Sequence, residues 1–220
     1  IEGPAVREIQ FFFMENWFRN GGEVLQTDLH FPNLKKRGSV LLMILCARNR
    51  KKGKPVQESY ISAINNARES VFITNAYFIP DAKIYRSLVK AASAGVNVTL
   101  ILPGESDIPI VKYASRYLYK RYLKNGIKIF EYGASILHAK TAVIDGIWST
   151  VGSSNLDRRS FRKNLEVNAV VLDQEFGEIM VKVFENDLTK SSEITLENFE
   201  KRGPMEFFLE WLAYRFRNIF

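Results

Sequence analysis

The chain has 220 residues, of which 31 are Lys or Arg and 24 are Asp or Glu, giving a formal net charge of +7. Apolar residues make up 46% and charged residues 25%, which is ordinary for a folded domain and excludes a disordered, collagen-like or disulfide-stapled chain. The single cysteine, Cys46, excludes an intrachain disulfide and a multi-cysteine zinc site, and we expect it to be a buried apolar residue.

The excess positive charge lies in the middle of the chain. Residues 48–137 hold 15 basic and 6 acidic residues, whereas the segments on either side are close to balance. The densest patch falls in a predicted loop and consists of Arg48, Arg50, Lys51, Lys52 and Lys54. A solvated loop explains this patch, but a basic middle third also suits nucleic acid or the anionic surface of a membrane. Charge alone leaves both partners open.

The first part of the chain predicts alternating helices and strands. Apolar residues at helical spacing predict a helix over residues 4–19, which Gly21 and Gly22 end. The apolar run 40–47 predicts a fully buried strand and is far too short to cross a bilayer, which takes roughly 20 residues. The expected strands cover residues 40–46, 71–76, 96–102 and 127–132, and the expected helices cover 56–67, 80–94 and 110–124.

The pattern changes after residue 132. Three strands over residues 140–144, 148–151 and 166–172 are expected with only loops between them, followed by a helix over residues 174–188. The face of this helix that we expect to be buried carries Phe176, Ile179, Met180, Val183 and Phe184. The whole predicts an α/β fold with a mixed central β-sheet flanked by helices.

A second amphipathic stretch, residues 204–220, mixes aromatic residues with arginines. Two interpretations stay open, a helix that lies in a membrane interface and a helix that packs against the rest of the protein. Glu206 and Glu210 weaken a purely basic polar face, which favours packing at least as much as the interface.

The candidate catalytic and phosphate-binding residues lie between positions 138 and 166. His138 and Lys140 are two apart in a predicted strand, so both side chains project from the same face. Asp145, a Gly-Ser-Ser-Asn turn at residues 152–155 and Glu166 follow. The other histidine, His30, has no charged or hydroxyl partner at a recognisable spacing, and no role is predicted for it.

This set fits phosphoryl chemistry. Near neutral pH a histidine can act as a nucleophile or an acid, and a lysine beside it holds an anion. The hydroxyl, amide and backbone donors of the turn add to that anion site, and Glu166 can accept from the second imidazole nitrogen of His138. Such a site needs no metal and no cofactor. The alternative is a buried structural histidine, although the spacing His-x-Lys-x4-Asp arises by chance only about once in 200 such sequences.

The segment resembles the HKD signature of the phospholipase D superfamily, on the strength of His138, Lys140, Asp145, Gly152, Ser153, Asn155 and Glu166. Residues 75–81, 102–107 and 155–161 further resemble the second half of bacterial cardiolipin synthases, and nearly the whole chain follows that pattern. Family members cleave or exchange phosphodiesters through a phosphohistidine, using two such motifs from two halves or two subunits. One histidine attacks phosphorus and the other protonates the leaving alcohol.

The resemblance implies a role for each residue of the motif. His138 is expected to be one of the two catalytic histidines, as the acid and base partner, with Glu166 orienting it. The implied phosphate ligands are Lys140, Ser153 and Asn155.

Three further residues receive less specific expectations. Asp145 belongs to the catalytic motif, and we expect it to hold the motif together rather than to touch substrate. Tyr77 and Asp81 are expected to line the pocket, and a purely structural role for that strand end stays equally open.

The resemblance also implies a domain organisation. Residues 1–32 would be the C-terminal end of a truncated first phospholipase D-like domain, residues 33–192 a second, catalytic one, and residues 193–220 an amphipathic helical tail. The chain begins at Ile1 rather than Met, without a secretory signal, and we expect it to be cut from a longer one. Because only His138 sits in a catalytic context, we expect little activity without the missing N-terminal half or a second copy of the chain.

The implied activity is that of a phosphatidyltransferase forming cardiolipin from phosphatidylglycerol and a second phospholipid. The expected partners are the anionic phospholipid substrate and the membrane surface, at the bacterial cell membrane on its inner leaflet or peripherally, with any transmembrane helices upstream. Nucleic acid is not the expected partner. Two alternatives stay open, a phospholipase D-like phosphodiesterase or nuclease and a non-catalytic lipid-binding module.

Overall fold

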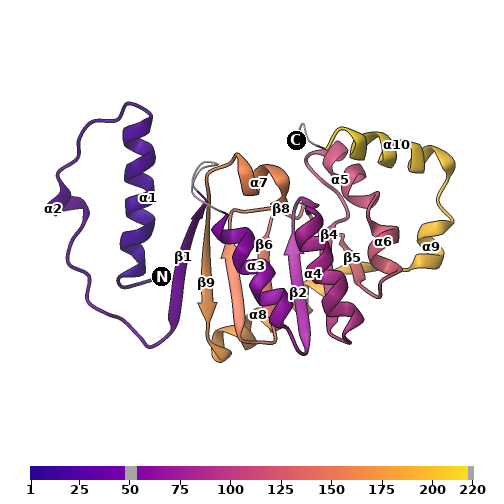
Figure 1. Cartoon of the computed structure of the whole chain (residues 1–220), viewed down its shortest axis with the longest axis horizontal. Coiled ribbons are helices and arrows are strands. Elements are labelled where there is room, and N and C mark those ends of the chain that lie inside the picture. Colours follow the sequence, from indigo (N-terminus) through magenta and orange to yellow (C-terminus); the bar gives the residue numbers. More distant parts are fainter. Residues whose placement is uncertain (48–53, 218–220) are drawn as a thin grey trace.

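One large mixed sheet organises the molecule. The structure, a computed structural model, describes residues 1–47 and 54–217. The strands of the sheet are β1 (Leu41–Ala47), β2 (Ser70–Asn75), β4 (Asn97–Pro103), β5 (Lys128–Tyr132), β6 (Lys140–Ile144), β7 (Trp148–Gly152), β9 (Glu166–Leu172) and β10 (Ser191–Ile194). Across the described residues these eight strands hydrogen-bond in the order β1-β9-β7-β6-β2-β4-β5-β10 (Figure 1). The predicted α/β fold with a mixed central sheet is confirmed.

Helices cover both faces of this sheet. The described helices, not all of which lie on the sheet, are α1 (Ala5–Arg19), α2 (Thr27–His30), α3 (Pro55–Asn66), α4 (Ala82–Ser93), α5 (Pro109–Arg116), α6 (Tyr119–Leu123), α7 (Arg158–Arg162), α8 (Gln174–Leu188), α9 (Leu196–Glu200) and α10 (Pro204–Arg215). In Figure 1, α3 and α4 lie in front of the sheet and α8 lies behind it. Of the helices described, none is both long and apolar enough to cross a membrane.

The alternation of side chains along a strand fills the two layers separately. On β2, Ile73 is fully buried in the larger core, to which α3 and α4 contribute, while its neighbour Phe72 points to the other face. There the Phe72 ring stacks on Phe184 of α8, with ring centroids 4.7 Å apart. Because side chains of a strand alternate between faces, a continuous apolar run is what a strand covered on both sides requires.

The two directions of pairing meet at β2. Strands β2, β4 and β5 run parallel, whereas β6 pairs antiparallel with β2 on one side and with β7 on the other. In the β2–β6 register, Asn75 lies opposite Lys140. The carboxyl end of β2 and the amino end of β6 therefore lie side by side.

Some expectations about burial are wrong. The strand predicted to be fully buried, β1, is an edge strand that pairs only with β9 among the described strands, and Leu41 and Met43 are 63% and 56% exposed. Cys46 on this strand is half-buried rather than buried. On α8, Ile179 and Val183 are exposed because only part of the apolar face reaches the sheet.

Some element boundaries also differ from the prediction. The single helix expected over residues 110–124 is divided into α5 and α6, since the Leu118 N–H donates to the Ser115 carbonyl in a tighter turn between them. The segment between β7 and β9, expected to be loop, holds α7 and a short strand β8 (Leu156–Asp157). This strand pairs parallel with β3 (Phe78–Ile79). The pattern of residues 189–200 gave no sign of β10 and α9.

Most of the predicted basic patch, Arg48, Arg50, Lys51 and Lys52, lies outside the described residues. Its remaining member, Lys54, directly precedes α3. Partial burial, and then the charge of Arg162, lower the pKa of Lys54.

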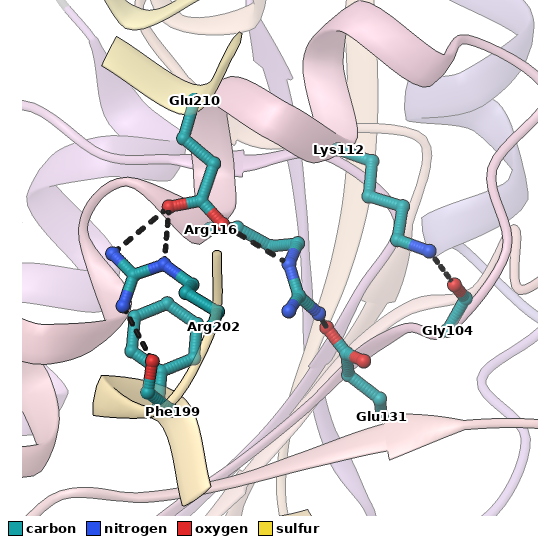
Figure 2. A network of polar contacts seen from close by, with 7 residues as sticks. All are labelled: Gly104, Lys112, Arg116, Glu131, Phe199, Arg202 and Glu210. Atoms are coloured by element: carbon teal, nitrogen blue, oxygen red, sulfur yellow. Dashed lines mark hydrogen bonds and ion pairs between the residues drawn. The ribbon is translucent and has the colours of Figure 1, made fainter. Parts of the chain in front are cut away.

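Helix α10 is fixed to α5 by a buried carboxylate (Figure 2). Glu210 is 1% exposed and lies 3.4 Å from Arg116 Nε and 3.1 Å from Arg202. Arg116 also forms an ion pair with Glu131 of β5, and Arg202 donates to the Phe199 carbonyl at 2.6 Å. Burial raises the pKa of Glu210, while the two arginines act against that rise. This face of α10 therefore packs against the domain, which agrees with the interpretation of residues 204–220 as a helix that packs against the rest of the protein.

We expect Glu210→Ala to lower the free energy of unfolding by about 3 kcal/mol, because it leaves Arg116 and Arg202 facing each other without their shared carboxylate. Urea unfolding followed by circular dichroism measures the change. The matched control is Glu206→Ala in the first turn of the same helix, where an exposed carboxylate contributes less than about 1 kcal/mol. Equal losses in the two variants would contradict the role given to the network.

Candidate active site

The imidazole of His138 is exposed at one end of the sheet. His138 directly precedes β6, and the Ala139 carbonyl accepts from the Ala76 N–H at 3.1 Å, which ties this segment to the end of β2. The Tyr77 ring meets the His138 ring edge-on, with centroids 6.0 Å apart and an interplanar angle of 79°. In the described part of the chain, no hydrogen bond or ion pair holds the imidazole itself. The ring is thus supported on one side and open to a reactant on another.

Lys140 is buried and places its ammonium between the backbone of His138 and the Tyr77 ring. Its Nζ donates to the carbonyl of His138 at 2.6 Å and lies 5.9 Å from the Tyr77 ring centroid. Burial lowers the pKa of Lys140, and the carboxylates of Glu166, Asp107 and Asp157 act in the opposite direction. An ammonium has three donors, and a buried one attracts an anion strongly because water does not screen it. Lys140 is therefore suited to hold a phosphate next to His138.

Glu166 contacts the turn rather than the histidine. Its carboxylate accepts from Ser153 Oγ at 2.6 Å and from Asn164 Nδ2 at 3.1 Å. The hydrogen bond expected between Glu166 and His138 is not formed between these described residues. Ser153 Oγ in turn accepts from the Val167 N–H at 3.0 Å. Ser153 is thus held in place on the edge of the site.

Two buried asparagines, which the sequence reasoning missed, position the Gly-Ser-Ser-Asn turn. Asn168 Oδ1 accepts from the Ser154 N–H at 3.3 Å, and its amide donates to Thr150 at 3.1 Å. Asn75 Oδ1 accepts from the Leu156 N–H at 3.1 Å. Both side chains are fully buried. The Nδ2 of Asn75 has no partner among the described residues. The signal in the sequence was an asparagine inside an apolar strand, since a buried amide is retained there for the hydrogen bonds that it makes.

Asn155 ends this turn with an amide that faces the site. It is buried, and its Oδ1 has no hydrogen-bond partner among the described residues. The unpartnered oxygen is an acceptor, so a ligand hydroxyl could supply the missing bond, whereas the Nδ2 of Asn155 is the atom that can donate to an anion.

Asp107, from the loop after β4, is a third residue that the sequence did not point to. Both of its carboxylate oxygens accept from the Tyr77 hydroxyl, at 2.8 Å each. Burial, and then this hydrogen bond, raise the pKa of Tyr77 to about 12. The same hydrogen bond lowers the pKa of Asp107. Asp107 therefore positions the ring against which His138 packs.

Asp145 lies at the opposite end of β6, five residues or roughly 16 Å along the strand from Lys140. Its carboxylate accepts from the backbone N–H groups of Arg68, Glu69 and Ser70 at 2.8–2.9 Å. Its own backbone has a positive φ of 52°. These contacts anchor β6 to the start of β2, and the structure does not bring Asp145 together with His138.

A cavity of 370 Å³ opens beside these residues. Tyr77, Asp81 and Asn155 are part of its wall. Asp81 also begins α4, where its Oδ1 accepts from the Lys83 N–H, and its Oδ2 accepts from Gln57 at 2.6 Å. The remaining lining consists of Ile79, Pro80, Ile108, Val111, Asp157, Arg158, Arg159, Asn164, Tyr214 and Arg217. The cavity thus combines an apolar wall with three guanidinium groups.

Within residues 1–47 and 54–217 there is no group of three or more His, Cys, Asp or Glu side chains arranged to hold a metal ion.

Comparison with known proteins identifies the family. Residues 60–188, more than half of the chain, match the family described as cardiolipin synthase, PLD-like domain. The chain belongs to this phospholipase D-like family. Its sequence is 34% identical over 204 residues to cardiolipin synthase 2 of Bacillus anthracis, covering 92% of this chain and 40% of that protein. A cardiolipin synthase of Staphylococcus aureus is 33% identical over 205 residues, covering 92% of this chain and 42% of the relative.

Solved structures show the same fold. Phosphatidylserine synthase of Haemophilus influenzae superposes with a TM-score of 0.65 at 12% identity, covering 94% of this chain and 51% of that one. The phospholipase D family member Nuc of Salmonella typhimurium superposes with a TM-score of 0.60 at 18% identity, covering 71% of this chain and 99% of that one. This chain spans about two fifths of the length of the curated relatives that it matches.

We expect Asp145→Ala to lower the free energy of unfolding by about 2–3 kcal/mol, because it leaves three backbone N–H groups without their acceptor at a residue with positive φ. Asp145→Asn keeps one acceptor oxygen and a side chain that tolerates this backbone, so its loss should be smaller. Urea unfolding of the three proteins measures the order. Full stability of Asp145→Ala would show that the carboxylate does not anchor β6.

The Tyr77–Asp107 hydrogen bond predicts a pH-dependent effect of Tyr77→Phe. The folded pKa of Asp107 is lowered, so its contribution to stability is present above the unfolded pKa and is lost as the pH falls through the folded one. Because the pair is exposed to solvent, we expect Tyr77→Phe to cost about 1 kcal/mol at pH 7.

The cost should shrink toward zero as the pH falls from 7 through the lowered pKa of Asp107, to a pH at which its carboxyl is protonated in the folded and the unfolded protein. Unfolding of both proteins at the two pH values is the measurement. A cost that is the same at both would contradict the coupling of Tyr77 to the Asp107 carboxylate.

Proposed function

We propose that this chain provides one catalytic histidine and the adjacent phosphate site of a phosphatidyltransferase of the cardiolipin synthase type. The observation that carries the proposal is that His138 and Lys140 both lie against the Tyr77 ring, and that Tyr77 and Asn155 line a cavity with an apolar wall and arginines. The 34% identity to cardiolipin synthase 2 of Bacillus anthracis over 92% of the chain supports the lipid substrate.

The proposed chemistry exchanges one alcohol for another on phosphorus. A histidine nitrogen attacks the phosphorus of phosphatidylglycerol, the bond from phosphorus to the glycerol headgroup breaks, and a second histidine gives that glycerol its proton. The hydroxyl of a second phospholipid then returns a proton to the same imidazole and attacks phosphorus, which breaks the P–N bond. With phosphatidylglycerol as both lipids, the products are cardiolipin and free glycerol.

His138 suits the acid and base step of this sequence. Its ring is exposed, and its one ring contact is the edge of Tyr77, so both imidazole nitrogens are free of protein hydrogen bonds among the described residues. Such a ring can take a proton from one alcohol and give it to another.

The Lys140 ammonium and the Nδ2 of Asn155 would donate to the phosphoryl oxygens and offset the charge that gathers on them as phosphorus becomes five-coordinate. The described residues occupy one of the three Lys140 donors, that on the His138 carbonyl, which leaves two for phosphate. Ser153 lies beside them but donates to Glu166, so it binds phosphate only if that hydrogen bond opens. We propose that Glu166 acts through Ser153 and Asn164 and not on His138 directly.

The second histidine must come from outside this motif. His30, the other histidine of the chain, lies at α2 beyond α1, on the far side of β1 from the site (Figure 1). We propose that the partner is an N-terminal phospholipase D-like half or a second copy of the chain. Residues 1–32, 33–192 and 193–220 remain the proposed divisions of the chain, and the membrane is its proposed place of action.

The test is to express the full-length gene that contains this chain in cells that lack cardiolipin and to analyse the extracted lipids. We expect cardiolipin to form, and we expect His138→Ala to lower its rate of formation at least about 10³-fold, because the proton transfer loses its catalyst. His30→Ala is the matched control and should leave the rate within about twofold.

Three results would contradict the proposal. One is the absence of cardiolipin although the protein is present and folded, and another is undiminished cardiolipin formation by His138→Ala. The third is salt-dependent cleavage of DNA in place of lipid exchange, which would identify the chain as a nuclease. Vesicle binding that survives His138→Ala, with no turnover in either protein, would instead identify a non-catalytic lipid-binding module.

A further inference from the structure

Helix α10 carries apolar side chains on two faces, and only one face is covered. The covered face holds Glu210, Ala213 and Tyr214, and the Tyr214 ring stacks on Tyr117 with centroids 4.6 Å apart. The other face carries an exposed row at positions i, i+3, i+4, i+7 and i+11, which is the spacing of one side of a helix. This row, called the α10 stripe below, consists of Met205, Phe208, Leu209, Leu212 and Phe216.

The stripe is apolar and uninterrupted. Its side chains are between 37% and 68% exposed, and Trp211 beside it is 43% exposed. The charged residues of the helix, Glu206, Glu210 and Arg215, fall outside it. A helix with apolar residues on nearly all sides is stable where both sides are covered, so the stripe requires a second contact.

The position of the stripe indicates what covers it. Tyr214 and Arg217, at the end of the same helix, line the cavity of the candidate active site, together with Arg158, Arg159 and the exposed Ile108. Figure 1 shows α10 and α7 both toward the same end of the strands, the upper end in that view. The stripe lies on the side of α10 opposite Glu210 and ends at Phe216, whose neighbour in the chain, Arg217, lines the cavity. An anionic lipid layer matches this arrangement, since acyl chains meet the apolar side chains of the stripe and phosphates meet the guanidinium group at its end.

The length of the helix fixes how it would lie. α10 has 12 residues and therefore spans roughly 18 Å, well short of the hydrocarbon thickness of about 30 Å. It can rest in the plane of the interface but cannot span it. In that orientation Phe208 and Leu212 point into the acyl region, and Trp211 lies near the headgroups.

We propose that the α10 stripe docks the protein on an anionic phospholipid surface and presents the cavity mouth to the headgroups. The proposal rests on the proposed function in one respect, because it makes the lipids of that surface the substrates of the cavity. Docking itself requires no turnover and is measured separately.

The first experiment measures binding of the chain to vesicles of phosphatidylglycerol by co-sedimentation. We expect Phe208→Ser/Leu212→Ser to weaken binding at least about tenfold, because interfacial affinity follows buried apolar area. The matched control is Phe13→Ser/Trp17→Ser on α1, which changes two similarly exposed apolar residues at the same i, i+4 spacing. It should bind as the unaltered chain does, and circular dichroism should show both variants folded.

The second experiment locates α10 in the lipid. In a Trp17→Phe/Trp148→Phe variant, Trp211 is the one remaining tryptophan. We expect its emission to shift to shorter wavelength on phosphatidylglycerol vesicles and to be quenched by lipids brominated on their acyl chains. Binding to phosphatidylcholine vesicles should be weaker, and the difference should narrow at high salt because the arginines are then screened.

Clear results would overturn the proposal. These are equal vesicle binding by the stripe variant and the unaltered chain, an unquenched Trp211, or equal affinity for the two lipids at low salt. A dimer in light scattering that the stripe variant abolishes, with vesicle binding unchanged, would show that a second copy covers the stripe instead. Quenching of Trp211 without cardiolipin formation by the full-length protein would remove the proposed activity and leave the docking in place.

Discussion

The position of β6 between β2 and β7 is the constraint on which the candidate site depends. At one end, the Asp145 carboxylate binds three N–H groups ahead of β2, and at the other, Lys140 lies opposite Asn75. A slip of one residue would turn every side chain of β6 to the other face and would move the Lys140 ammonium away from Tyr77. Asp145, at the end of β6 far from His138, thus fixes the pairing register of the strand that carries the rest of the motif.

Acidic side chains around Lys140 act against the effect of burial on its ammonium. Three carboxylates, from Glu166, Asp107 and Asp157, favour its ammonium form against the effect of burial. They come from β9, from the loop after β4 and from the start of α7, so the site gathers acidic groups from three parts of the chain around one cation. A phosphate diester entering there adds a further negative charge close to the ammonium, and the buried location makes that attraction larger than it would be in water.

The local parts of this arrangement were readable from the sequence, and the long-range parts were not. The spacing of His138, Lys140 and Asp145 depends on one strand, and a period of two residues suffices to place the first two together. Glu166 was expected beside His138, but Glu166 begins β9, and β7 lies between β9 and β6, so these two strands are two strand spacings apart, roughly 9.6 Å. That order of strands cannot be read from a linear pattern, so the contact of Glu166 with Ser153 was missed.

Asp107 could have been found, since Tyr77 and Asp107 follow β2 and β4, and parallel neighbouring strands end at the same edge of a sheet. The exposed edge of β1 illustrates the opposite limit. Leu41 and Met43 belong to an apolar run that looks buried, and only the strand order shows that nothing among the described strands pairs with the outer side of β1. An apolar run therefore predicts that a strand is present, but it does not predict whether neighbouring strands and helices cover that strand.

The buried network at Glu210 connects the fold to the proposed lipid surface. Apolar contact alone does not select one docking face for a helix with apolar residues on nearly all sides. A carboxylate that is stabilised only between Arg116 and Arg202 does select one, because any other rotation of α10 would leave it buried without a partner. Tyr214 and Arg217 follow Glu210 at i+4 and i+7 on the same side, so the rotation that Glu210 selects also turns them to the cavity. The stripe on the opposite side is left outward by the same choice.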